Sequence, residues 1–170
     1  MTKSAELIQR QKLPLTTPSD IPAEAVAEIT GGLNALLADV FTLYLKTKNF
    51  HWHMSGPHFR DYHLLLDEHG DQLFAMTDDL AERVRKLGGT TIRSIGHISR
   101  LKRIADNDAN FVTPGDMLGE IREDENSLVL SLRSLHTLCD DCGDIATASL
   151  LENFIDQAQR RVWFLFECSR

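Results

Sequence analysis

The sequence predicts an all-α fold, a bundle of four long helices with a short extra helix in the connection between helices 2 and 3. Two observations support this prediction. Apolar residues recur at helical spacing in four separate segments, and no segment shows a convincing strand alternation. The chain has 170 residues, 42% hydrophobic and 25% charged, which is ordinary for one globular domain.

The first helix is expected to start near Pro22, because proline is tolerated in a first helical turn. Ser19 or Asp20 would then be its N-terminal cap. Apolar residues follow at helical spacing to about Met54, and the Ser-Gly-Pro run at 55–57 predicts the end of this helix.

The second helix is expected from about His58 to Leu87. A strict seven-residue repeat supports it, and Gly88-Gly89 is typical of a helix C-terminus. The residues of the repeat are Phe59, Leu66, Leu73, Leu80 and Leu87.

The remaining elements follow from their end signals. Residues 88–113 form a connection too long for a turn, and isoleucine and leucine at helical spacing after residue 94 predict a short helix inside it. Thr113-Pro114 is a cap followed by proline, so the third helix should begin there and run to about Cys139. The fourth helix is expected to start at Asp144 and to continue almost to Arg170.

Residues 1–21 show no sustained periodicity, which predicts a flexible tail ahead of a bundle domain at 22–170. No apolar run approaches the ~18 residues of a membrane helix, and no secretion signal is evident, so we expect a cytoplasmic protein. The three cysteines are too few for a disulfide scaffold, which fits a reducing compartment. The net charge of -7 argues against nucleic-acid binding by the body of the protein.

One stripe of the second helix combines an imidazole with carboxylates. At about 100° per residue, His63, Asp67, Asp78 and Glu82 fall within roughly 100° of one another around the helix. Imidazole with several carboxylates is a ligand set that suits iron or manganese and leaves open positions for redox chemistry.

One helix cannot bring these residues to a single metal, since Asp67 and Asp78 are separated by roughly 16 Å along the axis. A second, antiparallel copy can, because the pairs His63/Glu82 and Asp67/Asp78 have the same sum of residue numbers and one twofold axis satisfies both. We therefore expect two equivalent metal sites at an isologous dimer interface. His51, near the end of the first helix, is the natural further ligand of the His63/Asp67 half.

Two alternatives stay open for these residues. Pairs of this kind at i, i+4 are common on solvated helix faces, and Arg83 and Arg85 could neutralise Asp78 and Glu82 in a surface network. A metal centre inside one bundle, as in ordinary ferritins, would need Glu-x-x-His motifs, and the sequence contains none.

A wider set of motifs resembles a known family. Residues 49–59 read NFHWHMSGPHF, His63 and Asp67 follow at spacings of four, and residues 78–83 read DDLAER. This resembles the Dps family of miniferritins, the DNA-binding proteins from starved cells, with the pattern H-W-x-x-x-G-x-x-F-x-x-x-H-x-x-x-D and then D-x-x-A-E-R. The match covers residues 30–168 and is dense from 49 to 88.

The resemblance implies a ferritin-like bundle assembled into a hollow dodecamer that oxidises Fe(II), preferably with hydrogen peroxide rather than oxygen, and stores Fe(III) inside. It assigns the ferroxidase ligands to His51, His63 and Asp67 of one subunit and to Asp78 and Glu82 of its twofold mate. Trp52 matches the family's tryptophan beside the centre, where an indole could intercept radicals; otherwise it is packing at a helix end.

The resemblance also implies an acidic iron channel near the start of the fourth helix. Asp140, Asp141, Asp144 and Glu152 could supply its charge, although Ser149 stands where the family often has an acid. Helix capping is an equally good explanation for Asp144.

Binding of DNA, and with it an association with the nucleoid, would depend on the tail, whose first 20 residues carry three basic and two acidic side chains. The alternative is a tail that docks along the subunit. The Cys139-x-x-Cys142 spacing lacks the context of a redox or zinc motif.

Two other functions remain as alternatives. One is a DNA-compacting protein with little ferroxidase activity. The other is a plain dimeric bundle that serves as an interaction module.

Overall fold

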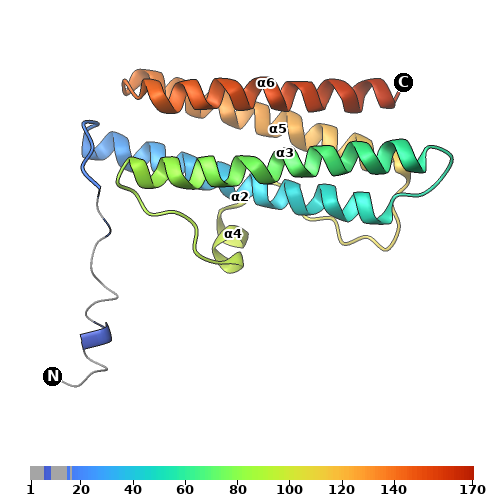
Figure 1. The fold of residues 1–170 in the computed structure, drawn as a ribbon, viewed down its shortest axis with the longest axis horizontal. Helices are drawn as coiled ribbons and strands as arrows, with labels where there is room; N and C mark the ends of the chain where they lie inside the picture. Colours follow the sequence, from blue (N-terminus) through green and yellow to red (C-terminus); the bar gives the residue numbers. More distant parts are fainter. Residues whose placement is uncertain (1–5, 9–14, 16) are drawn as a thin grey trace.

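A computed structural model describes residues 6–8, 15 and 17–170 of the chain. In this part four long helices form a bundle: α2 (Ala23–His53), α3 (Phe59–Lys86), α5 (Pro114–Asp141) and α6 (Ile145–Cys168). The short α4 (Ile95–Leu101) lies beside the bundle, within the long connection from α3 to α5 (Figure 1). The predicted all-α bundle with one extra helix is therefore confirmed.

The helices pack as two pairs, α2 with α3 and α5 with α6, and α2 also lies against α5. The seven-residue repeat of α3 faces this core, because Leu66, Leu73, Leu80 and Leu87 are at most 3% exposed. Phe59 is the exception at 45% exposure, since it is the first residue of α3 and lies at the open end of the bundle. The repeat therefore predicts the buried face of α3 except at its N-terminus.

The start of α2 differs from the prediction. Its first helical residue is Ala23, and the carbonyl oxygen of Pro22 accepts the first helical hydrogen bond, from the amide of Val26 at 2.9 Å. Pro22 is thus the N-cap, and neither Ser19 nor Asp20 caps the helix. The Ser19 hydroxyl instead accepts a hydrogen bond from the amide of Ile21, so it stabilises the turn before the helix.

The junction between α5 and α6 is also displaced from the prediction. α5 continues two residues beyond Cys139, to Asp141, and Gly143 ends it with a φ of +73°, a conformation that favours glycine. Asp144 then caps α6, because its side chain accepts a hydrogen bond from the amide of Thr147. The predicted cap of α5 is confirmed, with Thr113 accepting from the amide of Asp116.

By length and composition α2 could cross a membrane, contrary to our expectation from the sequence. Its most apolar 18-residue window has a mean hydropathy of 1.3, but 56% of that window is buried inside the bundle. Core helices meet the same test, and we assign α2 to the core.

The part of the connection that follows α4 is fixed to α2 by a buried carboxylate. Asp39 is 2% exposed and accepts hydrogen bonds from the backbone amide and the guanidinium of Arg103, at 2.6–2.8 Å. The oxygen that accepts from this amide also lies 3.4 Å from the amide of Ile104. These bonds hold the connection against α2, where it forms one wall of a groove described below.

Candidate metal centre

Two histidines at the junction of α2 and α3 orient each other. The Nδ1 of His51 lies 2.7 Å from the carbonyl oxygen of His63, and the Nδ1 of His63 lies 2.9 Å from the carbonyl oxygen of His51. The two rings stack with centroids 3.7 Å apart. Since a carbonyl only accepts, each Nδ1 carries a proton, which leaves Nε2 as the ring nitrogen that could bind a metal. A backbone carbonyl that accepts from the other ring nitrogen is a common way of orienting a histidine for metal binding.

Asp67 lies next to these imidazoles, one turn after His63 on α3. Its Oδ1 is 3.7 Å from the Nε2 of His51. The structure therefore brings together the three predicted residues that come from one chain: His51, His63 and Asp67.

Lys48, which the sequence analysis did not single out, already pairs with this carboxylate. Its Nζ lies 2.5 Å from Asp67 Oδ1. The hydrogen bond from Lys48 lowers the pKa of Asp67, and the same bond raises the pKa of Lys48. In the sequence, only the spacing pointed to Lys48 as a neighbour of the candidate ligands. Lys48 precedes His51 by three residues and therefore shares its helix face.

Asp78 and Glu82 lie further along α3 and are exposed. Glu82 forms a surface ion pair with Lys86 at 3.0 Å, and in the described part of the chain Asp78 has no ion pair. The arginines that could have neutralised them are engaged elsewhere. Arg83 binds Asp144 at 2.6 Å, and Arg85 donates to the backbone of Leu15. In the described part of the chain, neither arginine therefore pairs with Asp78 or Glu82, whereas the Glu82–Lys86 pair is of the kind expected on a solvated helix face.

Trp52 is 59% exposed and lies next to His51 in the chain. It lines a groove of about 1000 Å³ between α2 and the connection that contains α4. Other exposed apolar residues of the same groove are Leu45, Ile95 and Phe111. Large apolar side chains exposed together are typical of a surface that another molecule covers.

Among the residues that the structure describes, no group of three or more His, Cys, Asp and Glu side chains is arranged to hold a metal. His51, His63 and Asp67 are together, whereas Asp78 and Glu82 lie about three to four turns further along the same helix. The chain thus presents two separate groups of candidate ligands.

The acidic residues near the start of α6 have different roles. Asp144 is 3% exposed and bonds to Arg83 and Thr147, so the capping explanation is the correct one. Glu152 lies 3.2 Å from the Nε2 of His136, and Asp140 lies 3.4 Å from its Nδ1.

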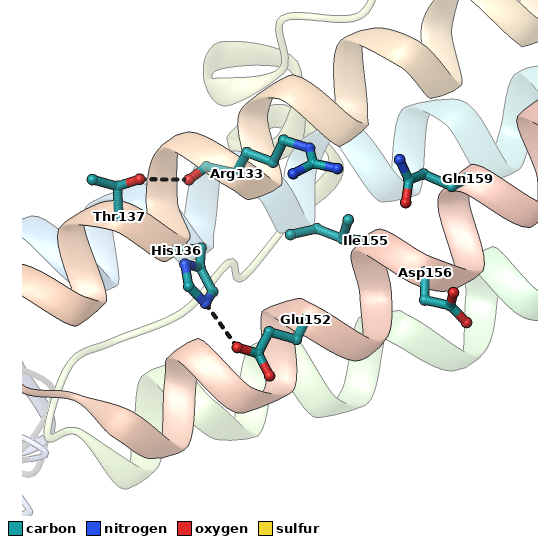
Figure 2. A pocket seen from close by; sticks show the side chains of 7 residues that line it. All are labelled: Arg133, His136, Thr137, Glu152, Ile155, Asp156 and Gln159. Carbon is teal, nitrogen blue, oxygen red and sulfur yellow. Dashed lines mark hydrogen bonds and ion pairs between the residues drawn. The ribbon is translucent and has the colours of Figure 1, made fainter.

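Figure 2 shows His136 of α5 and Glu152 of α6 pointing toward each other and joined by a hydrogen bond. Both line a pocket of about 370 Å³. The two carboxylates near His136 contact opposite nitrogens of its ring. A metal ion bound to His136 and to both carboxylates would need the two carboxylates next to the same ring nitrogen. Asp140 and Glu152 lie next to different nitrogens, so these three residues do not form a chelate.

The Cys139-x-x-Cys142 motif carries no redox chemistry in this fold. Both cysteines are free, and Cys139 is fully buried. Burial, with Asp144 as the next cause, raises the pKa of Cys139 to about 12. A thiol in that state is a poor nucleophile and metal ligand at neutral pH.

The chain is similar to known proteins over most of its length. A family model described as a ferritin-like domain matches residues 30–168. The DNA protection during starvation protein of Agrobacterium fabrum is 32% identical, over 88% of this chain and 92% of that protein.

Solved structures resemble it as well. Dps from Thermosynechococcus elongatus superposes with a TM-score of 0.84 at 28% identity, covering 86% of this chain and 93% of that one. Antigen TpF1 from Treponema pallidum superposes with a TM-score of 0.86 at 26% identity, covering 91% and 99%.

Proposed function

This chain belongs to the Dps proteins of the ferritin-like family, and from that premise we propose that it oxidises Fe(II) at sites shared between two subunits. The Fe(III) is stored in a hollow cage, which we propose is a dodecamer in the cytoplasm. By consuming Fe(II) and peroxide together, the protein protects DNA from oxidative damage.

The reciprocal bonding of His51 and His63 is the observation that supports this proposal most strongly. Each ring is held by the other residue's carbonyl through Nδ1–H, so Nε2 of each ring is the atom that would bind iron. Asp67 adds a carboxylate next to them. Two imidazoles and a carboxylate with open positions suit iron that must exchange and react.

Asp78 and Glu82 would complete the centre from a second subunit. They are exposed, and in the described part of the chain neither pairs with an arginine, although Glu82 pairs with the exposed Lys86. Two acidic side chains four residues apart on a helix repel each other, and a bound cation relieves this repulsion. The twofold relation between the residue numbers puts them opposite His63 and Asp67 of the neighbouring copy.

The apolar groove supports such a dimer. Trp52 lies at once in the groove and next to His51, so a second subunit seated there would approach the histidines. Leu45 and Ile95, which are 58% and 80% exposed, would be removed from water by the same contact.

Lys48 has a specific part in this proposal. Its ammonium group neutralises Asp67 while no metal is bound, and it has to give up the carboxylate for Asp67 to bind a cation. Lys48 therefore competes with the metal and weakens binding on that side of the centre.

Iron at the paired sites would supply two electrons to hydrogen peroxide, which avoids the release of hydroxyl radical. The chain's own residues bind and orient: the histidines donate Nε2, and the carboxylates favour the higher charge of Fe(III). Trp52 is placed to be oxidised in place of other residues. Uptake falls at acid pH, because the ligands must be deprotonated.

The second candidate function is DNA compaction through residues 1–21. Of this tail, positions 1–5, 9–14 and 16 lie outside the described residues. Leu15 and Thr17 lie against the C-terminal end of α3, where Leu15 accepts a bond from Arg85 and Thr17 is next to Gly88. This contact favours the alternative in which the tail docks on the subunit, and we propose DNA protection by iron removal as the main function.

Complementation between two inactive variants tests the proposal. His63→Ala and Asp78→Ala should each abolish peroxide-driven Fe(II) oxidation, since each damages both sites of a homodimer. Co-assembly at equal amounts should restore about a quarter of the wild-type sites, because half of the dimers are mixed and each mixed dimer has one intact site. Asp79→Ala, an exposed neighbour off the ligand stripe, is the matched control and should stay active. A mixture as inactive as its parents contradicts the shared centre.

A further inference from the structure

The core of the bundle contains a layer of polar side chains that the metal centre does not use. Arg161 of α6 and Glu125 of α5 are both 0% exposed and form two hydrogen bonds, Nε to Oε1 at 2.6 Å and Nη2 to Oε2 at 3.0 Å. His69 of α3 and Thr47 of α2 are also 0% exposed. Polar groups at this depth are unfavourable unless they are hydrogen bonded.

Contacts between neighbouring residues show that His69 and Arg161 lie at the same level of the bundle. On the surface, Arg160 pairs with Glu68 at 3.0 Å. The next residue of each helix, Arg161 and His69, turns inward.

Thr47 belongs to nearly the same level on α2. Gly70 of α3 faces the Lys48 side chain of α2, since a Cβ at this position would lie 2.8 Å from Cδ of Lys48. Gly70 follows His69, and Lys48 follows Thr47, so the two inward residues come from adjoining turns of α2 and α3. The layer therefore has one polar side chain from each of the four long helices.

Four polar atoms of this layer have no protein partner. In the part of the chain that the structure describes, they are Thr47 Oγ1, Arg161 Nη1 and both ring nitrogens of His69. Buried polar atoms in native proteins nearly always have a partner, either a protein group or an ordered water. Arg161 Nη1 can only donate, whereas the hydroxyl and a neutral imidazole offer both donors and acceptors.

The charges restrict what could occupy the layer. A metal cation is disfavoured, because the guanidinium of Arg161 would repel it. An anion is disfavoured as well, because Glu125 already neutralises that guanidinium through two hydrogen bonds. A small neutral molecule with both donors and acceptors matches the unpaired atoms.

We propose that the Thr47–His69–Arg161 layer is an internal binding site for ordered water. Buried water typically makes about three hydrogen bonds to groups that otherwise lack partners. Water bound here would join α2, α3 and α6 through hydrogen bonds, and the Glu125–Arg161 pair adds α5. The site is separate from the proposed iron centre and does not depend on that function.

Crystallography of the assembled protein, at a resolution that shows ordered solvent, tests this site. In each subunit we expect electron density for an ordered water within hydrogen-bonding distance of Arg161 Nη1 and of a ring nitrogen of His69. Crystals soaked in bromide or in Co²⁺ should show no anomalous peak in the layer. A dry layer, or an anomalous peak from either ion, would overturn the proposal.

A variant of His69 tests whether its imidazole ring helps to bind the water. His69→Leu has no nitrogen to hydrate and should lose the density next to residue 69, whereas unchanged density would contradict a site shared with His69. If His69→Leu does not assemble, His69→Gln replaces it. The glutamine amide of that variant keeps donor and acceptor groups and should retain the water, and loss of the water would contradict the proposal equally.

Discussion

The core and the α2/α3 face of this protein each contain an ion pair, but the two pairs differ in their exposure to solvent. In the core, Glu125 and Arg161 are both 0% exposed. On the face, the side chains of Lys48 and Asp67 are 15% and 43% exposed. A buried charge that loses its partner has no replacement, whereas a half-exposed carboxylate can exchange an ammonium group for another cation. Losing one partner of the first pair should therefore destabilise the fold, whereas the second pair is suited to binding.

The largest change in stability is expected from breaking the Glu125–Arg161 pair in the core. Arg161→Met leaves Glu125 buried without a counter-charge and should lower the free energy of unfolding by about 3–5 kcal/mol. Chemical denaturation at a fixed protein concentration measures this free energy of unfolding. The matched control is Arg160→Met, which removes the exposed pair with Glu68 and should cost about 0–1 kcal/mol.

A double variant sharpens this experiment. Replacing both partners, as Glu125→Leu with Arg161→Met, should recover much of the loss, because no charge stays buried. If Arg161→Met lowers the free energy of unfolding no more than Arg160→Met does, the core pair does not have the structural role assigned to it.

On the α2/α3 face, removal of a ligand should mainly weaken metal binding. His51→Ala deletes a donor atom and the ring that stacks on His63, although the backbone carbonyl that accepts from His63 Nδ1 stays, and should weaken metal binding by roughly 10- to 100-fold. Titration with Co²⁺, followed by absorbance, measures this affinity. His53→Ala is the control, since His53 is exposed and its ring bonds to the carbonyl of Asn49, its one hydrogen-bond partner among the described residues. Equal affinities for the two variants would contradict the assignment of His51.

A smaller effect, of opposite sign, is expected for Lys48→Met. Without the competing ammonium group, metal affinity should rise by up to about tenfold, and the free energy of unfolding should change by less than about 1 kcal/mol. The pKa of Asp67, lowered by Lys48, should rise towards its usual value.

The pH dependence of this pair follows from the sign of the shift. A lowered carboxyl pKa means that the pair is complete near neutral pH and is lost as the pH falls through that lowered value. A carboxyl-carbon NMR titration of the metal-free protein should show a higher midpoint for Asp67 in Lys48→Met than in the wild type. An unchanged midpoint and affinity would show that Lys48 does not compete for the carboxylate.

The smallest effect concerns the thiol in the core. Because Cys139 is buried and its pKa is about 12, it should stay unmodified when the folded protein is treated with iodoacetamide at about pH 8. Peptide mass spectrometry identifies the labelled cysteines, and the partly exposed Cys142 is the internal comparison. Labelling of Cys139 as fast as Cys142 would show that this part of the core opens readily.

Much of the fold was predictable because helix signals are local. Caps and apolar periodicity placed α3 and α6 within about one residue of their observed ends. The displaced ends have local causes too: Pro22 accepts the first bond of α2, and Gly143 rather than Asp140 ends α5. Of the candidate site, the sequence predicted His51, His63 and Asp67 as neighbours, and the fold brings them together.

Other features had no signal in the sequence. The Glu125–Arg161 pair joins residues 36 positions apart, and Arg83 reaches Asp144 across 61 positions. Before the fold is known, Arg83 is as available to Asp78 as to Asp144, so the surface-network alternative could not be dismissed.

The sequence by itself determined the helices, the face that each helix buries and the separation of the candidate ligands into two groups, because spacing along a helix fixes direction and distance. Only the tertiary structure decided which charges meet. It paired Lys48 with Asp67, turned each histidine's Nδ1 to the other's backbone and buried Arg161 beside Glu125. Packing of the helices decides these contacts, since it sets which side chains lose water and must find a partner within the protein.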